Sequence, residues 1–166
     1  MPDVLKENIL IETEKYVREQ LEGEGSGHDW WHIHRVRNMA LSIAKEENAD
    51  IFIVELASLL HDIADHKFHD GDEAIGPKVA GDWLATLNVN EATITHVKEI
   101  ISDLSFKGAK VATPMRTIEG KIVQDADRLD AIGAIGIARA FAYGGHKNRE
   151  LYNPEMSPTQ HDSVDD

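Results

Sequence analysis

Residues 51–65 read IFIVELASLLHDIAD, and this stretch decides the fold. Its apolar side chains recur at helical spacing, which predicts a core helix from Ile51 to about Asp65. The run leads directly into His61-Asp62. Burying a carboxylate beside an imidazole is costly unless something pairs with both, and a divalent cation does so. A His–Asp hydrogen bond at a helix end is the structural alternative.

The rest of the chain also repeats its apolar side chains at helical spacing, with no alternating strand pattern. Small residues late in the last segment, such as Gly133 and Gly136, let another helix approach closely. The predicted fold class is therefore all-α, a helical bundle in a single domain. We expect further helices up to Leu21, after the N-cap Asp29 to about Ile43, from about Glu73 to Leu87, from Asn90 to Leu104 and from about Ile118 to Tyr143.

The composition is that of one ordinary globular domain. The chain has 166 residues, 42% of them hydrophobic, which is enough to bury a core. Its formal net charge of −13 argues against binding nucleic acid or a membrane surface through bulk positive charge. There is no Cys, which excludes disulfide scaffolds, zinc ribbons and thiol catalysis. Because no apolar run approaches about 20 residues and no signal peptide is evident, we expect a soluble cytoplasmic protein.

Two polar side chains outside residues 51–65 are expected to point inward. His32 shares the apolar stripe of its helix with Val36, Met39 and Ile43. A satisfied core histidine is the structural alternative for it. Asp127 lies inside an apolar helix on a face with small and apolar side chains, which a solvated acidic edge would not explain well.

These positions compose one candidate ligand set of two imidazoles and two carboxylates: His32, His61, Asp62 and Asp127. Nitrogen and oxygen ligands together suit Mn²⁺, Fe²⁺, Co²⁺, Ni²⁺ or Zn²⁺, and with water also Mg²⁺. A cation there would lower the pKa of a bound water and polarise a phosphoryl group. The sequence therefore predicts one divalent metal ion and a small phosphorylated substrate.

The same residues occur in an order that resembles the HD-domain superfamily of metal-dependent phosphohydrolases. That family's pattern is His, then His-Asp, then Asp, on separate helices of an all-α bundle. Residues 32–36 (HIHRV) resemble its first element, His61-Asp62 is the naming pair, and residues 126–129 (ADRL) resemble its last element. Each element is weak alone, but the three in order make a specific signal.

A narrower resemblance is to small bacterial HD proteins of the YpgQ/YedJ type. It rests on residues 61–68 (HDIADHKF), on residues 105–107 (SFK) and on residues 119–145. Members of that branch are associated with nucleotide pyrophosphohydrolase activity, with manganese favoured. The resemblance therefore implies cleavage of a nucleoside triphosphate to a monophosphate and pyrophosphate.

The resemblance also implies which residues act on water. Asp65, one helical turn after His61, matches the acidic residue that many HD nucleotidases use to orient or deprotonate the attacking water. A surface carboxylate is the structural alternative. His66 is a candidate general acid or phosphate contact, with a solvent-facing loop residue as the alternative.

Phosphates need local cations in so acidic a chain. Between Ser105 and Thr117 the charged side chains are Lys107, Lys110 and Arg116, so this basic loop is a candidate phosphate clamp. We expect Lys67 and Lys107 to be the principal phosphate ligands, although a surface lysine is usually only solvated.

Four other charged residues near the motifs are candidate substrate contacts. Arg35, Lys121 and Arg128 are candidates for phosphate, although Arg35 and Arg128 would serve equally as braces for ligand carboxylates. Asp130, one turn after Asp127, is a candidate contact for a ribose hydroxyl, with a structural carboxylate as the alternative.

Three other functions stay open at this point. A 5′-nucleotidase-like phosphomonoesterase would use the same metal and water. A dinuclear HD phosphodiesterase would need further histidine ligands, for which His66, His69 and His96 are the candidates. A non-catalytic nucleotide-binding regulatory module is disfavoured because all four ligands are present.

The resemblance covers roughly residues 1–152, which we expect to form the phosphohydrolase domain. Members of the branch usually continue past the Asn153-Pro154 segment into further helices. Here residues 153–166 hold almost nothing to bury, and we expect a mobile tail in place of those helices. The Gly/Ala stripe and the acidic surface permit a homodimer.

Overall fold

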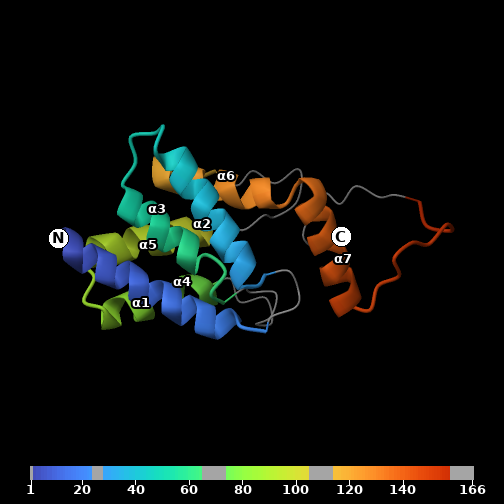
Figure 1. The fold of residues 1–166 in the computed structure, drawn as a ribbon, viewed down its shortest axis with the longest axis horizontal. Coiled ribbons are helices and arrows are strands. Elements are labelled where there is room, and N and C mark those ends of the chain that lie inside the picture. The colour runs from blue at the N-terminus through green and yellow to red at the C-terminus, as the bar shows by residue number, and fades with distance from the viewer. Residues whose placement is uncertain (1, 24–27, 65–73, 105–113, 158–166) are drawn as a thin grey trace.

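The computed structural model describes residues 2–23, 28–64, 74–104 and 114–157, and in these ranges the regular structure is helical, with no strand (Figure 1). This confirms the predicted all-α class. The helices are α1 (Asp3–Leu21), α2 (Trp30–Ala44), α3 (Ile51–Leu60), α4 (Ile75–Thr86), α5 (Glu91–Leu104), α6 (Ile118–Asp130) and α7 (Gly133–His146).

Side-chain caps fix the starts of α2, α3 and α6. The carboxylate of Asp29 accepts a hydrogen bond from the backbone N–H of His32, which confirms Asp29 as an N-cap. Asp50 caps α3, and the hydroxyl of Thr117 caps α6. Each cap satisfies a backbone donor that would otherwise lack an intrahelical partner. The caps therefore fix the first residues of the three helices that carry the predicted metal ligands or lead into them.

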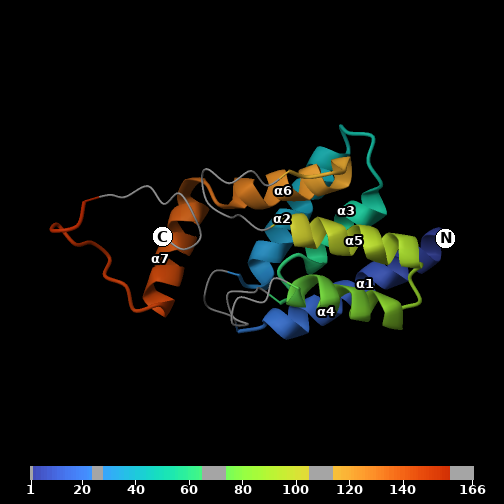
Figure 2. The same ribbon diagram turned by 180° about the vertical axis from the view of Figure 1, so that it is seen from behind.

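The apolar run of α3 forms the centre of the bundle. Phe52 and every residue from Val54 to Leu60 are buried, and α3 contacts α1, α2, α5 and α6. Figure 2 shows α3 partly behind α5. The helix ends at Leu60, earlier than predicted, and residues 61–64 form a turn. The His-Asp pair therefore lies at the end of the core helix rather than within it.

The single helix predicted from Ile118 to Tyr143 is wrong, because the chain turns a corner between Asp130 and Gly133. Gly133 has a φ of 66°, a left-handed conformation that favours glycine. A Cβ on Gly136 would meet the backbone of Ala131 at 2.2 Å, so only glycine lets the first turn of α7 lie so close. These two glycines shape the corner, and the approach of another helix to this stripe stays a prediction.

Helix α7 stands across the far end of α6, away from α1–α5 (Figures 1 and 2). None of its residues is buried in the part of the chain that the structure describes. Ile132, just before it, is 63% exposed and Ile137 is 62% exposed. The apolar stripe predicted to continue through this segment is therefore not packed against the described bundle.

One position on α2 also differs from the prediction. Met39 is 43% exposed, whereas the buried stripe runs through Ile33, Val36 and Ala40 together with His32. Met39 instead lines a pocket of about 340 Å³ at the contact between α2 and α6. The inward orientation predicted for His32 is confirmed.

Residues 153–157 follow α7 as turn and coil, and the rest of the predicted tail, residues 158–166, lies outside the described ranges. Among the described helices, none combines the length and the apolar character needed to cross a membrane.

Candidate metal centre

The imidazoles of His32 and His61 meet in the interior, between α2 and the end of α3. Their Nε2 atoms are 3.2 Å apart. The side chain of His32 is fully buried and that of His61 is 1% exposed. The two rings meet edge to face, with centroids 5.2 Å apart. Two ring nitrogens, one from α2 and one from the turn after α3, therefore point at one place.

Two carboxylates approach the same nitrogens. Asp62 Oδ2 lies 3.3 Å from His32 Nε2 and 3.5 Å from His61 Nε2. Asp127 Oδ1, from α6, lies 3.4 Å and 3.9 Å from the same two atoms. The four residues predicted as metal ligands are thus brought together by α2, the turn after α3, and the last turn of α6.

The outer nitrogens of both rings are already bound. His61 Nδ1 lies 2.8 Å from the carbonyl oxygen of Ser58, which only accepts, so this nitrogen donates. His32 Nδ1 lies 2.8 Å from Asp130 Oδ2 and donates to that carboxylate. In each neutral ring the lone pair is then on Nε2, directed at the shared space. This is the tautomer that a metal ligand needs.

The contacts within the cluster shift the pKa values of His32 and Asp62. Burial lowers the pKa of His32, but the hydrogen bonds to Asp130 and Asp62 outweigh it and raise that pKa to about 9. Burial raises the pKa of Asp62, yet the nearby His61 and the hydrogen bonds with His28 and His32 hold it well below its usual range. A proton on His32 therefore takes the place that a cation would have among these groups.

The chemistry of this donor set fits a divalent metal ion. Ligand atoms of His32, His61 and Asp127 lie within 4.8 Å of one another, and Asp62 adds a second carboxylate. Two imidazole nitrogens with two carboxylates suit a first-row divalent cation. Two buried Nε2 lone pairs that face each other have no partner better than a proton or a cation.

Asp130 holds His32 and Arg35 at once. Arg35 Nε donates to Asp130 Oδ1 at 2.7 Å, and Arg35 Nη2 donates to Oδ2 at 3.0 Å. Arg139 of α7 donates to the same Oδ2 at 3.3 Å. Burial raises the pKa of Asp130, but the hydrogen bonds from His32 and Arg35 lower it well below its usual value. Asp130 and Arg35 thus brace His32, one of the predicted ligands, and their predicted substrate contacts stay predictions.

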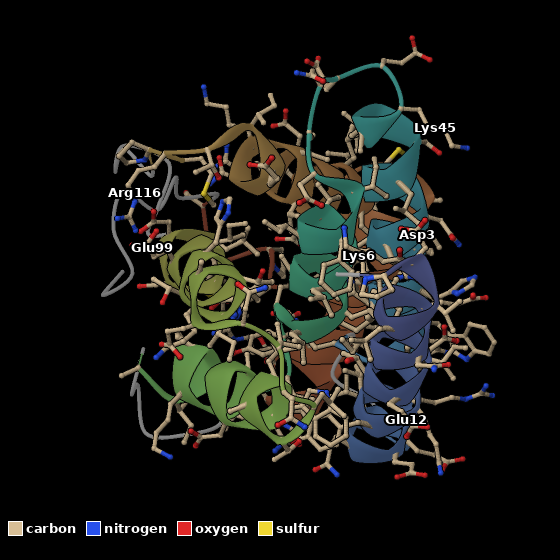
Figure 3. The ribbon with its side chains drawn as sticks, turned by 90° about the vertical axis from the view of Figure 1, so that its left-hand side faces the viewer. Asp3, Lys6, Glu12, Lys45, Glu99 and Arg116 are labelled. Atoms are coloured by element: carbon tan, nitrogen blue, oxygen red, sulfur yellow. The ribbon has the colours of Figure 1, made fainter. Side chains whose placement is uncertain are left out.

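Arg116, in the predicted phosphate clamp, forms ion pairs with two carboxylates of α5. Its Nε donates to Asp103 at 2.7 Å, and its Nη1 is 3.7 Å from Glu99 (Figure 3). Lys121 and Arg128 are exposed on α6. The remaining predicted site residues lie outside the described ranges, so the structure does not place them: Asp65, His66, Lys67 and Lys107.

Of the histidines considered for a second metal, the structure describes His96. His96, on α5, is bound to Thr117 at 3.1 Å and lies 3.6 Å from Glu119. It belongs to neither of the groups of potential ligands that the described residues form. His66 and His69 are outside the described ranges.

Sequence reasoning missed His28. Its Nδ1 lies 2.7 Å from Asp62 Oδ2, and its ring meets that of His32 edge to face at 5.7 Å. His28 precedes the first residue of α2, so helical periodicity could not assign it to the buried face. The available signals were its position four residues before His32 and the clustering of histidines in the first half of the chain.

The sequence of this chain matches a known protein family and known relatives. Residues 30–132 match the HD domain family. The chain is 46% identical to the YpgQ protein of Bacillus subtilis over 158 residues, which are 95% of this chain and 76% of YpgQ.

Solved structures have the same fold. A Lactobacillus plantarum protein superposes with a TM-score of 0.81 at 36% identity, over 95% of this chain and 72% of that one. The structure of Bacillus subtilis YpgQ in complex with ADP superposes with a TM-score of 0.73 at 39% identity, over 92% of this chain and 74% of that one. The structure of an HD-superfamily hydrolase from Bacillus thuringiensis superposes with a TM-score of 0.69 at 47% identity, over 92% of this chain and 73% of that one.

Proposed function

This chain belongs to the HD domain family, and we propose that it hydrolyses nucleoside triphosphates to a nucleoside monophosphate and pyrophosphate. One divalent metal ion, with Mn²⁺ favoured, would be its cofactor. The observation that carries the proposal is the convergence of two Nε2 atoms and two carboxylates at one buried place.

The substrate class draws support from a relative. The structure of Bacillus subtilis YpgQ, 39% identical to this chain, was solved in complex with ADP. ADP carries the base, sugar and anhydride linkage of a nucleoside triphosphate. A small nucleotide also suits a chain whose net charge of −13 disfavours a polyanion such as nucleic acid.

His32, His61, Asp62 and Asp127 would hold the cation. When bound, the cation lowers the pKa of a water and polarises a phosphoryl oxygen. Ser58 and Asp130 keep the two imidazoles in the tautomer that presents Nε2 to the site. Because both rings are buried, these contacts hold them in a single orientation.

The proton and the phosphates are assigned to the predicted site residues outside the four ligands. Asp65, three residues after Asp62, takes the proton of the attacking water, and general-base catalysis of this kind contributes about 10²–10⁴-fold. Water adds across the anhydride bond between the α- and β-phosphoryl groups, and pyrophosphate leaves. His66 protonates or contacts the departing group, and Lys67 and Lys107 offset its charge.

A product assay tests this proposal. The chain is loaded with Mn²⁺ and incubated with ribo- and deoxyribonucleoside mono-, di- and triphosphates, and pyrophosphate and orthophosphate are read separately. We expect pyrophosphate from triphosphates, with activity abolished in Asp62→Ala and reduced about 10²–10⁴-fold in Asp65→Ala. Asp125→Ala is the matched control, because Asp125 is exposed on α6.

Other outcomes would replace the proposal with a different one. Orthophosphate from monophosphates would identify a 5′-nucleotidase-like phosphomonoesterase at the same metal. Two metal ions per chain would identify a dinuclear site. Metal and nucleotide binding without turnover would identify a regulatory module.

A further inference from the structure

His28 lies against the metal centre from outside the four proposed ligands. It comes from the segment just before α2, whereas Asp62 comes from the turn after α3. The Nδ1 of His28 and the Oδ2 of Asp62 are 2.7 Å apart, although the two residues are 34 positions apart in the chain. This is the shortest contact of Asp62 with any of the three histidines around it.

The geometry places His28 beside one edge of the site only. Ligand atoms of His28, His32 and Asp62 lie within 4.8 Å of one another, and so do those of His32, His61 and Asp127. His28 belongs to the first group and not to the second. Its Nδ1 is hydrogen-bonded to Asp62 Oδ2 at 2.7 Å, so in this contact the ring is a partner of the carboxylate rather than a ligand.

Asp62 needs such a partner more than the two ligand histidines do. His32 is anchored within a helix and by Asp130, and His61 is anchored by the carbonyl of Ser58. Asp62 lies in a turn beyond the end of α3, where no helix holds its backbone. Its carboxylate has hydrogen bonds with His28 and His32, and the bond with His32 is given up when His32 Nε2 turns its lone pair to a cation. The Nδ1–H of His28 supplies the donor that remains.

We propose that His28 is a positioning residue: it donates its Nδ1–H to Asp62 Oδ2 and so holds Asp62 in the orientation that binds the metal ion. This rests on the metal site of the proposed function. Outer partners of metal ligands typically contribute about 10–100-fold to metal affinity. The role requires an N–H at the place of Nδ1, but not the rest of the imidazole ring.

Three variants at this position test the proposal in the full-length chain. His28→Ala removes the ring, and His28→Phe keeps a ring without a nitrogen. His28→Asn keeps an N–H close to the place of Nδ1. The Mn²⁺ dissociation constant is measured by electron paramagnetic resonance of the free ion and by calorimetry. His34→Ala is the matched control, because His34, on α2, is bound to the exposed Asn38.

We expect affinity about 10–100-fold weaker in His28→Ala and His28→Phe, and close to that of the unchanged chain in His28→Asn and His34→Ala. The midpoint of thermal unfolding in the presence of EDTA should be similar for all of them, because His28 is partly exposed at a helix start. Equal affinity of His28→Ala and the unchanged chain would overturn the proposal. So would an equal loss in His28→Asn and His28→Ala, since the ring itself would then be the ligand. An unchanged chain that binds no Mn²⁺ would overturn the proposed function as well.

Discussion

Helices α6 and α7 follow each other in the chain and carry similar apolar periodicity, yet only α6 belongs to the core. Helix α6 buries Ile122, Val123 and Ala126 and contacts α2, α3 and α5. Helix α7, in the described structure, buries no residue and contacts α6. Periodicity therefore predicts that a segment is helical, but it does not predict which side of a corner will be packed.

Residues on both sides of the corner contact the candidate metal centre or the residues that brace it. Asp127 and Asp130 lie in the last turn of α6, where one faces the metal centre and the other holds the outer nitrogen of His32. From α7, Arg139 reaches back to Asp130 at 3.3 Å. We expect changes in α6 to affect metal binding or folding strongly, and changes in α7 to have smaller effects.

The largest expected effect is on α6. Asp127→Ala removes a direct ligand, so Mn²⁺ affinity should fall by more than the roughly 100-fold upper limit for an outer partner. Asp125→Ala, two residues away and exposed, should bind Mn²⁺ as the unchanged chain does. Calorimetric titration of both variants measures this. Similar affinities in the two variants would show that α6 does not contribute a ligand.

One Ile→Ala substitution in each helix compares how much α6 and α7 contribute to the free energy of unfolding. Ile122→Ala should lower the free energy of unfolding by about 2–5 kcal/mol, because Ile122 is 2% exposed. Ile137→Ala, at a position 62% exposed in α7, should change it by less than about 0.5 kcal/mol. Urea denaturation of both variants measures the difference. A large loss in Ile137→Ala would mean that α7 is packed against something in solution.

The next effect in size concerns the link between the helices. Asp130→Asn keeps the shape of the side chain but removes the charge that holds His32 and Arg35, so Mn²⁺ affinity should fall about 10–100-fold. Arg139→Ala removes the contact from α7 and should cost less than about tenfold, because Arg35 still holds Asp130. Calorimetric titration with Mn²⁺ measures the loss of affinity in the two variants. A greater loss in Arg139→Ala would give α7 a direct part in the site.

Protonation of His32 makes both stability and metal binding depend on pH. In the metal-free chain the pKa of His32, about 9, is above its unfolded value of about 6.5. Its contribution to stability is therefore complete below pH 6.5 and is lost as the pH rises through 9. Metal binding needs the neutral ring, so Mn²⁺ affinity should rise by up to about tenfold per pH unit over the same interval.

The pH prediction is checked by urea denaturation in EDTA and by Mn²⁺ titration, each between pH 6.5 and 8.5. Both slopes should be reduced in Asp130→Asn, because Asp130 contributes to the raised pKa of His32. They should persist in Ile137→Ala. A metal affinity that is independent of pH would show that no proton leaves His32 on binding.

The sequence by itself determined the helical class and the four proposed ligands. Helical spacing is a local property, so the core helix that begins at Ile51 and the inward orientation of His32 could be predicted from neighbouring residues. Imidazole and carboxylate side chains on apolar faces have few inexpensive partners, which is why His61, Asp62 and Asp127 could be grouped without coordinates.

Only the tertiary structure decided the partners of those ligands and the corner after α6. Asp130 reaches His32 across 98 positions of sequence, and His28 reaches Asp62 across 34. Such contacts depend on how helices pack, and no local spacing encodes them. The corner at Gly133 likewise combines a left-handed glycine with the close approach of α7 to the backbone of Ala131. An apolar stripe continues through a corner unchanged, so periodicity could not show where the chain turns away from its core.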